Sequence, residues 1–151
     1  MDRLLAILDH REESLALIEE MAELADGVGA EVFVLSLLTK DEFEEQAEVT
    51  GAVRSVEGSQ GGVMSGSDAA KSIGERTLAE NIPGVEVDRV IGEVADDDDR
   101  VDIVLERADD HDVDHIALVG RRRSPTGKAI FGDVAQGVIL NFDGYVTITM
   151  A

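Results

Sequence analysis

Short apolar runs of strand length alternate with stretches of helical periodicity along this chain, and this alternation restricts its fold more than any other feature. Residues 4–8 and 32–38 are almost uninterrupted apolar runs, as is typical of strands buried on both faces of a parallel sheet. Between them, from Glu12, apolar residues recur three and four positions apart until Gly27 and Gly29, which are helix stop signals. A strand, a helix and a second strand in this order pack as a parallel unit. The first third of the chain therefore predicts an α/β fold.

The same alternation continues toward the C-terminus. Helices are predicted at residues 68–80, after the acidic run 96–99 and from residue 130, and strands at residues 85–91, 115–119 and 145–149. The helix at 68–80 has Ala69 and Ile73 on its inward face, with Thr77 as a further candidate. Residues 85–91 alternate apolar and polar side chains, which favours an edge strand. We expect one domain over residues 1–151 with an open, mostly parallel five-stranded sheet, Rossmann-like, and helices on both faces.

Residues 39–65 lack this periodicity. An acidic block (DEFEEQAE) leads into a glycine-rich segment (GSQGGVMSGS). Because a compact domain rarely carries so long a connection without a function or disorder, we expect a mobile loop here that could include one helical turn.

Acidic side chains outnumber basic ones by 33 to 13, which gives the chain a formal charge of −20. Such an excess, spread along the sequence, is typical of proteins adapted to concentrated salt, where counter-ions screen the mutual repulsion. We therefore expect a halophilic source, with an unusually acidic protein of a mesophile as the alternative. A surface of this charge repels phosphate backbones and anionic lipid head groups, so we expect neither nucleic acid nor a membrane as a partner.

The chain contains no cysteine, which excludes a disulfide framework, a thiol nucleophile and a zinc-thiolate site. Its first ten residues lack the longer apolar core and the small-residue cleavage site of a signal peptide. No apolar run approaches the roughly 20 residues of a membrane span. We therefore expect a cytoplasmic protein.

The local motifs favour a binding function over a catalytic one. The acidic run at 96–99 precedes a helical pattern, where carboxylates cap N–H groups, and Arg100 stands where an EF-hand needs an oxygen ligand. His111 and His115 have i,i+4 spacing, but His115 falls where a strand should begin, so we do not expect a metal site on one helical face. No serine has a G-x-S-x-G motif, and residues 120–129 do not fit a P-loop.

Basic residues concentrate at one predicted junction of strand, loop and helix. Arg121, Arg122, Arg123 and Lys128 all lie within eight positions after Gly120. Free backbone N–H groups and the positive end of a helix dipole favour anions at such a junction. The cluster predicts either a phosphate or nucleotide site, or ion pairs with the chain's own acidic residues or with a second copy.

A second polar position, Asp9, ends the first predicted strand. In open parallel sheets, ligands lie outside the carboxyl ends of the strands, at the point where the strand order reverses. If the first and fourth strands are neighbours across that point, Asp9 and the loop after Gly120 face each other and define the site.

The order of elements, Asp9 at the end of the first strand and the segment RSPTGKAIFGDVAQGVILN together resemble the universal stress protein family in its haloarchaeal form. The resemblance implies a fold of the adenine nucleotide alpha-hydrolase type. For the nucleotide-binding branch it implies a phosphate-binding pattern of Gly, two residues, Gly, nine residues, then Gly followed by Ser or Thr. It also implies that the first-strand aspartate and the backbone near Leu37 hold the adenosine.

This chain departs from that pattern. With Gly132 as the third glycine, Val119 and Arg122 occupy the first two glycine positions and Asp133 replaces the Ser or Thr. Losing a glycine removes close backbone approach to phosphate and an ionised carboxylate repels it, whereas arginines can pair with phosphate at longer reach. The candidate residues around a nucleotide or another anionic small molecule are Asp9, Leu37, Val119, Gly120, Arg121, Arg122, Arg123, Gly127, Gly132, Asp133 and Val134.

The sequence therefore predicts a non-catalytic stress-response or regulatory module that binds ATP weakly or not at all. The alternative is a member that binds ATP or another adenine nucleotide as a cofactor, with the phosphates held by residues 120–133. A third hypothesis is an enzyme of the wider alpha-hydrolase-like group that uses the same cleft. The resemblance also implies a homodimer through the last strand. The uncharged run from Tyr145 to Thr149 agrees, because it would otherwise be an exposed pairing template.

Overall fold

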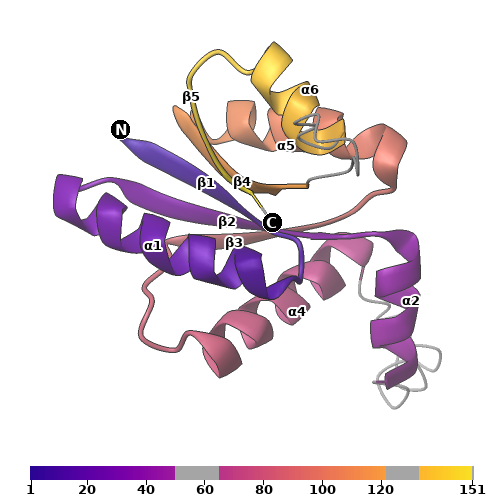
Figure 1. Ribbon diagram of the computed structural model, residues 1–151. Coiled ribbons are helices and arrows are strands. Elements are labelled where there is room, and N and C mark those ends of the chain that lie inside the picture. The colour runs from indigo at the N-terminus through magenta and orange to yellow at the C-terminus, as the bar shows by residue number, and fades with distance from the viewer. Residues whose placement is uncertain (50–64, 122–132, 151) are drawn as a thin grey trace.

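A five-stranded parallel sheet forms the centre of the protein in the computed structural model, which describes residues 1–49, 65–121 and 133–150 (Figure 1). The strands are β1 (Arg3–Leu8), β2 (Glu31–Leu38), β3 (Arg89–Val94), β4 (His115–Gly120) and β5 (Tyr145–Met150). Their order across the sheet is β3-β2-β1-β4-β5, and every neighbouring pair is parallel. The strand order therefore reverses between β1 and β4, which are neighbours, as the predicted site requires.

Helices cover both faces of this sheet. The described helices are α1 (Glu12–Val28), α2 (Lys40–Val49), α4 (Gly66–Asn81), α5 (Asp97–Asp110) and α6 (Asp133–Asn141). Figure 1 shows α1 and α4 on one face and α5 and α6 on the other. Each face has its own apolar core, one containing Ile18 of α1 and Leu78 of α4, the other Val104 of α5 and Val138 of α6. The predicted fold class is confirmed. None of the described helices combines the length and apolar character that a membrane-spanning segment needs.

The expectation of a loop from residue 39 onward is wrong for its first part, because residues 40–49 form helix α2. A reciprocal pair of hydrogen bonds begins this helix. The Thr39 backbone N–H donates to Glu42 Oε1 at 2.8 Å, and the Glu42 backbone N–H donates to Thr39 Oγ1 at 3.1 Å. This is a capping box, which satisfies two amide groups that would otherwise lack partners. The remaining part of the predicted loop, residues 50–64, lies outside the described residues.

The third strand begins four residues later than the apolar alternation predicts, at Arg89 instead of residue 85. Asp88 explains the start point. Its backbone N–H donates to the carbonyl oxygen of Val32 at 2.9 Å, and its carboxylate accepts from the Val32 N–H at 2.6 Å. The Asp88 side chain thus accepts the hydrogen bond of a β2 N–H group just before the pairing of β2 with β3 begins. The strand lies at the edge of the sheet, as predicted.

Helix α4 turns a different face to the sheet from the one its apolar residues predict. Ala70, Gly74 and Leu78 are its buried residues, whereas Ala69, Ile73 and Thr77 are only half-buried. The contact face is thus shifted by one residue. A glycine at the centre of this face lets the helix lie close to the strands.

Candidate functional site

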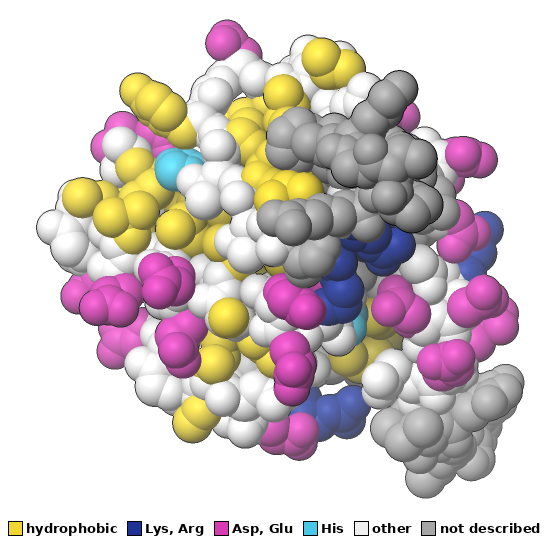
Figure 2. Space-filling model, viewed as in Figure 1, with side chains coloured by type: hydrophobic (Ala, Val, Ile, Leu, Met, Phe, Trp, Pro, Cys, Tyr) yellow, Lys and Arg dark blue, Asp and Glu magenta, His cyan; other side chains and the backbone are white. Residues whose placement is uncertain are grey.

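The carboxyl ends of β1 and β4 lie next to each other, so Asp9, directly after β1, and Gly120, the last residue of β4, lie at the same edge of the sheet. Figure 2, viewed as in Figure 1, shows a group of Lys and Arg side chains near the centre of this face, among many Asp and Glu side chains. The structure therefore brings the start of the predicted cationic loop to the edge that carries Asp9.

The Asp9 carboxylate is held by Arg11, a residue outside the predicted set. Arg11 Nε donates to Asp9 Oδ2 at 3.0 Å, and the Arg11 backbone N–H donates to Asp9 Oδ1 at 3.2 Å. Arg11 Nη2 donates to the same carboxylate and, at 3.4 Å, to the carbonyl oxygen of Val119. The guanidinium thus bridges the ends of β1 and β4. The hydrogen bond to Asp9 raises the pKa of Arg11.

Both partners of this ion pair are shielded from solvent, since the side chains of Asp9 and Arg11 are only 13% and 28% exposed. Hydrogen bonds between such charged groups are stronger than neutral ones. The carboxylate that the family resemblance assigns to adenosine is therefore occupied by a cation of the same chain.

His10 lies between these two residues in an uncommon backbone conformation, with φ of 68°. Its half-buried ring places Nε2 3.4 Å from the hydroxyl of Ser36 on β2. Burial lowers the pKa of His10, against the opposite effect of the nearby Glu42 and Asp9 carboxylates. Ser36 itself is completely buried, so it cannot act as a nucleophile on a ligand at this edge.

Two further ion pairs involve residues at or after the carboxyl ends of β2 and β3. Lys40 Nζ of α2 lies 3.7 Å from Asp96 Oδ2, and the Lys40 backbone N–H donates to Asp96 Oδ1 at 3.1 Å. Arg107 Nε of α5 lies 3.5 Å from Glu93 Oε1 of β3. Arg121 makes no ion pair within the described part of the chain and is exposed. No ion pair with the described residues therefore competes with an anion for its guanidinium.

The other predicted site residues divide into two groups. The side chains of Leu37 and Val119 are buried in the two cores, so these residues could contact a ligand only through their backbone. Val134 is half-buried and packs against the core, and Asp133 is the first residue of α6. Arg122, Arg123, Gly127 and Gly132 lie outside the described residues. Two residues that the sequence reasoning missed, His10 and Arg11, are central to the geometry.

The strand order, the helices on both faces and the reversal beside Asp9 define an α/β protein of the adenine nucleotide alpha-hydrolase-like fold. The model of the universal stress protein family matches residues 1–149, so the chain belongs to this family. A search of curated proteins gave no match.

Three solved structures of universal stress proteins have the same fold. One from Archaeoglobus fulgidus is 24% identical with a TM-score of 0.57, and the match covers 98% of this chain and 97% of that one. A complex with cAMP is 16% identical with a TM-score of 0.56, covering 99% and 96%. A structure of a universal stress protein from A. fulgidus in complex with dAMP is 19% identical with a TM-score of 0.51, covering 98% and 96%.

Proposed function

We propose that this protein is a non-catalytic regulatory module of the universal stress protein family that binds adenine nucleotides weakly or not at all. The observation that carries this proposal is the contact of Arg11 with Asp9. A nucleotide that uses Asp9 as its adenosine partner must first displace the guanidinium. A hydrogen bond to a charged group contributes about 1.5 kcal/mol or more, so this displacement weakens binding by about tenfold or more.

The absence of catalysis rests on the chemistry of the same edge. His10 has its ring turned to the buried Ser36, and the Asp9 carboxylate is neutralised by Arg11. Neither residue is arranged as an acid or base facing an open reaction site. A regulatory role requires only that the module change its contacts with a partner.

The alternative function is tight binding of an adenine nucleotide, with its phosphates near the loop that follows Gly120. Two observations favour it. Neighbours of the same fold were crystallised with cAMP and dAMP. The guanidinium of Arg121 is exposed at the end of β4. In this version Arg11 turns from Asp9 toward the phosphates when the nucleotide enters.

Titration calorimetry with magnesium ATP, AMP and cAMP separates the two functions. We expect the wild type to bind weakly in high salt and Arg11→Ala to bind at least about tenfold more tightly. Arg89→Ala is the matched control, because Arg89 is an exposed arginine at the start of edge strand β3. Tight binding by the wild type that Arg11→Ala abolishes would establish the alternative. With no tryptophan and one tyrosine in the chain, nucleotide retained on purification would dominate absorbance near 260 nm.

Asp133→Ser tests the contribution of the phosphate loop separately. Serine restores the hydroxyl that the family pattern has at this position, and it removes a negative charge at the first residue of α6. We expect this variant to bind ATP more tightly than the wild type, and Asp133→Asn, which removes only the charge, to gain less. Unchanged binding in both variants would contradict the assigned role of Asp133.

We further propose a homodimer through β5. This strand is at the edge of the sheet, carries no charged residue and begins with Tyr145, whose side chain is 67% exposed. Leu140 of the preceding helix is also exposed. Figure 2 shows hydrophobic side chains gathered over the region of β5 and α6. A second copy that pairs along β5 would cover both the free backbone groups and these side chains.

A further inference from the structure

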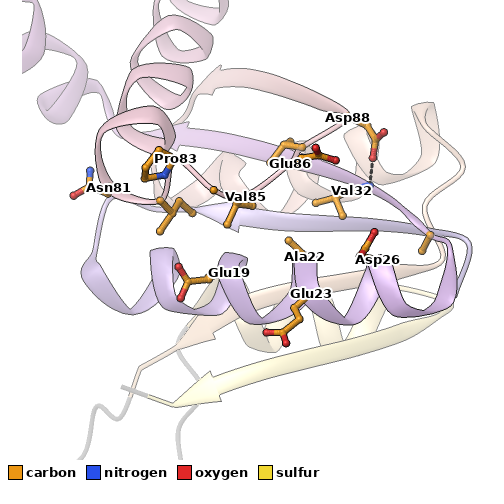
Figure 3. A pocket seen from close by; sticks show the side chains of 14 residues that line it. Glu19, Ala22, Glu23, Asp26, Val32, Asn81, Pro83, Val85, Glu86 and Asp88 are labelled. Carbon is orange, nitrogen blue, oxygen red and sulfur yellow. Dashed lines mark hydrogen bonds between the residues drawn. The ribbon is translucent and has the colours of Figure 1, made fainter.

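A groove of about 1180 Å³ opens at the edge of the sheet opposite to Asp9 (Figure 3). One wall is the C-terminal half of α1, which ends shortly before β2 begins. The other wall is the segment 81–88, which leads from α4 to the start of β3. Because α1 starts at the carboxyl end of β1 and runs to the amino end of β2, this groove is separate from the site around Arg11.

The floor of the groove is apolar. Ala22 of α1, Val32 of β2 and Val85 of the opposite wall lie close together in the groove (Figure 3), and Val87 also lines it. Val32 is buried, and the other three are partly buried against the core under α1. An apolar side chain placed here would contact these residues and lose part of its exposure to water.

Among the described residues that line the groove, five carry carboxylates on its rim and none has a basic side chain. Glu19, Glu23 and Asp26 lie on α1, and Glu86 and Asp88 lie on the opposite wall (Figure 3). Asp88 accepts a backbone hydrogen bond from β2. The other four carboxylates make no hydrogen bond or ion pair with the described residues.

This rim differs from the edge around Asp9, where carboxylates have partners. Asp9, Glu93 and Asp96 each lie beside a basic side chain. Like charges around a concave apolar surface raise the local negative potential, because the low-dielectric walls focus the field. The groove is therefore complementary to a ligand that combines positive charges with an apolar part.

We propose that this groove binds a cationic, partly apolar peptide segment of a partner protein. Lys or Arg side chains of the segment contact Glu19, Glu23 and Glu86 on the rim, and an apolar side chain between them packs on Val85 and Ala22. The volume favours a peptide, since it exceeds the roughly 300 to 1,000 Å³ of sites for small molecules. The inference goes beyond nucleotide binding and does not depend on it.

Fluorescence polarisation with a labelled synthetic peptide tests the proposal. The peptide alternates Lys or Arg with Leu or Val, and a control peptide of equal charge has Ser and Gly in place of the apolar residues. We expect the first peptide to bind and the control to bind about tenfold more weakly. Spermine, a cation without apolar side chains, should compete poorly. Equal binding of the two peptides, or strong competition by spermine, would overturn the proposal.

The triple variant Glu19→Gln/Glu23→Gln/Glu86→Gln should weaken peptide binding by about tenfold. Its matched control removes the same charge from exposed carboxylates elsewhere, in Glu75→Gln/Asp102→Asn/Asp109→Asn, and should change affinity by less than about twofold. If both triple variants bound the peptide equally weakly, the peptide would be attracted to the acidic surface in general. This result would overturn the proposal.

Ala22→Arg provides a second variant that fills the groove and brings its own cation to the rim. We expect it to abolish peptide binding. Circular dichroism of each variant checks that it is folded, so that a loss of binding can be assigned to the groove. Arg11→Ala leaves the groove unchanged and should bind the peptide as the wild type does, which separates this proposal from that on nucleotides.

Discussion

Gly92 of β3 lies directly against the backbone of Lys71 in α4, with no space for a side chain between the two elements. A Cβ atom on Gly92 would lie 2.1 Å from Lys71 N and 2.2 Å from the carbonyl oxygen of Ser67. Gly74 makes a similar approach from the helix, where a Cβ atom would lie 2.6 Å from Ser36 Cβ. Gly92 and Gly74 thus set the distance between α4 and the strands β3 and β2. Ser36 of β2 is the residue beside His10.

Gly92→Ala should therefore destabilise the protein strongly. Both neighbours are backbone atoms, which cannot rotate away, so α4 must move off the sheet. Overpacking of this kind costs about 1–3 kcal/mol or more, and we expect a loss of at least about 2 kcal/mol in the free energy of unfolding. Denaturant unfolding at constant salt measures it. Gly84→Ala is the control, because, apart from its two chain neighbours, no atom of the described residues lies within 4 Å of the added Cβ. A similar small effect in both variants would contradict the argument.

The sequence predicts the fold well because strand burial and helix periodicity are local patterns. The apolar runs that form β1, β2 and β4 are buried along almost their whole length. The contact face of α4 was wrong because Gly74 has no side chain to contribute to an apolar pattern. Close helix packing at a glycine depends on the opposite element, here Ser36, which lies far away in the sequence.

The site was predictable only in part. Asp9 and the start of the cationic loop could be assigned to one edge from topology alone. Arg11 was missed because a single arginine near a helix start resembles any solvated charge. Its spacing of two residues from Asp9 was the available signal, since it allows both the backbone N–H and the side chain to reach the same carboxylate. His10 gave no signal, because its contact with Ser36 is formed only by the fold.

Two histidines predict a pH dependence of stability. Burial lowers the pKa of His10 and of His115 below 6.5 in the folded protein. Below about pH 6.5 the unfolded chain therefore binds protons that the folded protein does not, and stability falls as the pH drops. We expect the free energy of unfolding to decrease between about pH 7 and pH 5 at constant salt. The loss should end once the folded form is protonated as well.

The double variant His10→Asn/His115→Gln should remove most of this dependence. Asparagine is chosen at position 10 because it tolerates the positive φ of that residue. Denaturant unfolding at the two pH values compares the variant with the wild type. An unchanged slope in the variant would assign the pH dependence to other groups.

Stability should also depend on salt. The formal charge of −20 leaves many carboxylates without a cation, such as the four on the rim of the groove between α1 and residues 81–88 that are unpaired among the described residues. Their repulsion is screened by salt, because the Debye length shortens from about 10 Å at 0.1 M salt to about 3 Å at 1 M. We expect the melting temperature to rise from millimolar to molar KCl. The variant Glu19→Gln/Glu23→Gln/Glu86→Gln should reach a given melting temperature at a lower salt concentration than the wild type. A melting temperature equal in both solutions would refute the expectation of a halophilic protein.

A dimer through β5 predicts that a charge at Tyr145 separates the two copies. In that dimer the exposed ring, which lies beside the His115 ring at a centroid distance of 6.0 Å, is covered by the partner strand. Tyr145→Lys places a charged side chain in each copy where the partner strand would cover the ring, so pairing has to remove this charge from water, which opposes it. Light scattering coupled to size-exclusion chromatography should then give a dimer for the wild type and a monomer for the variant. Leu24→Lys, at a 47% exposed apolar residue of α1, is the matched control and should stay dimeric. A monomeric wild type would show that the protein does not dimerise. A dimer that only Leu24→Lys disrupts would show that the two copies pair through α1 and not through β5.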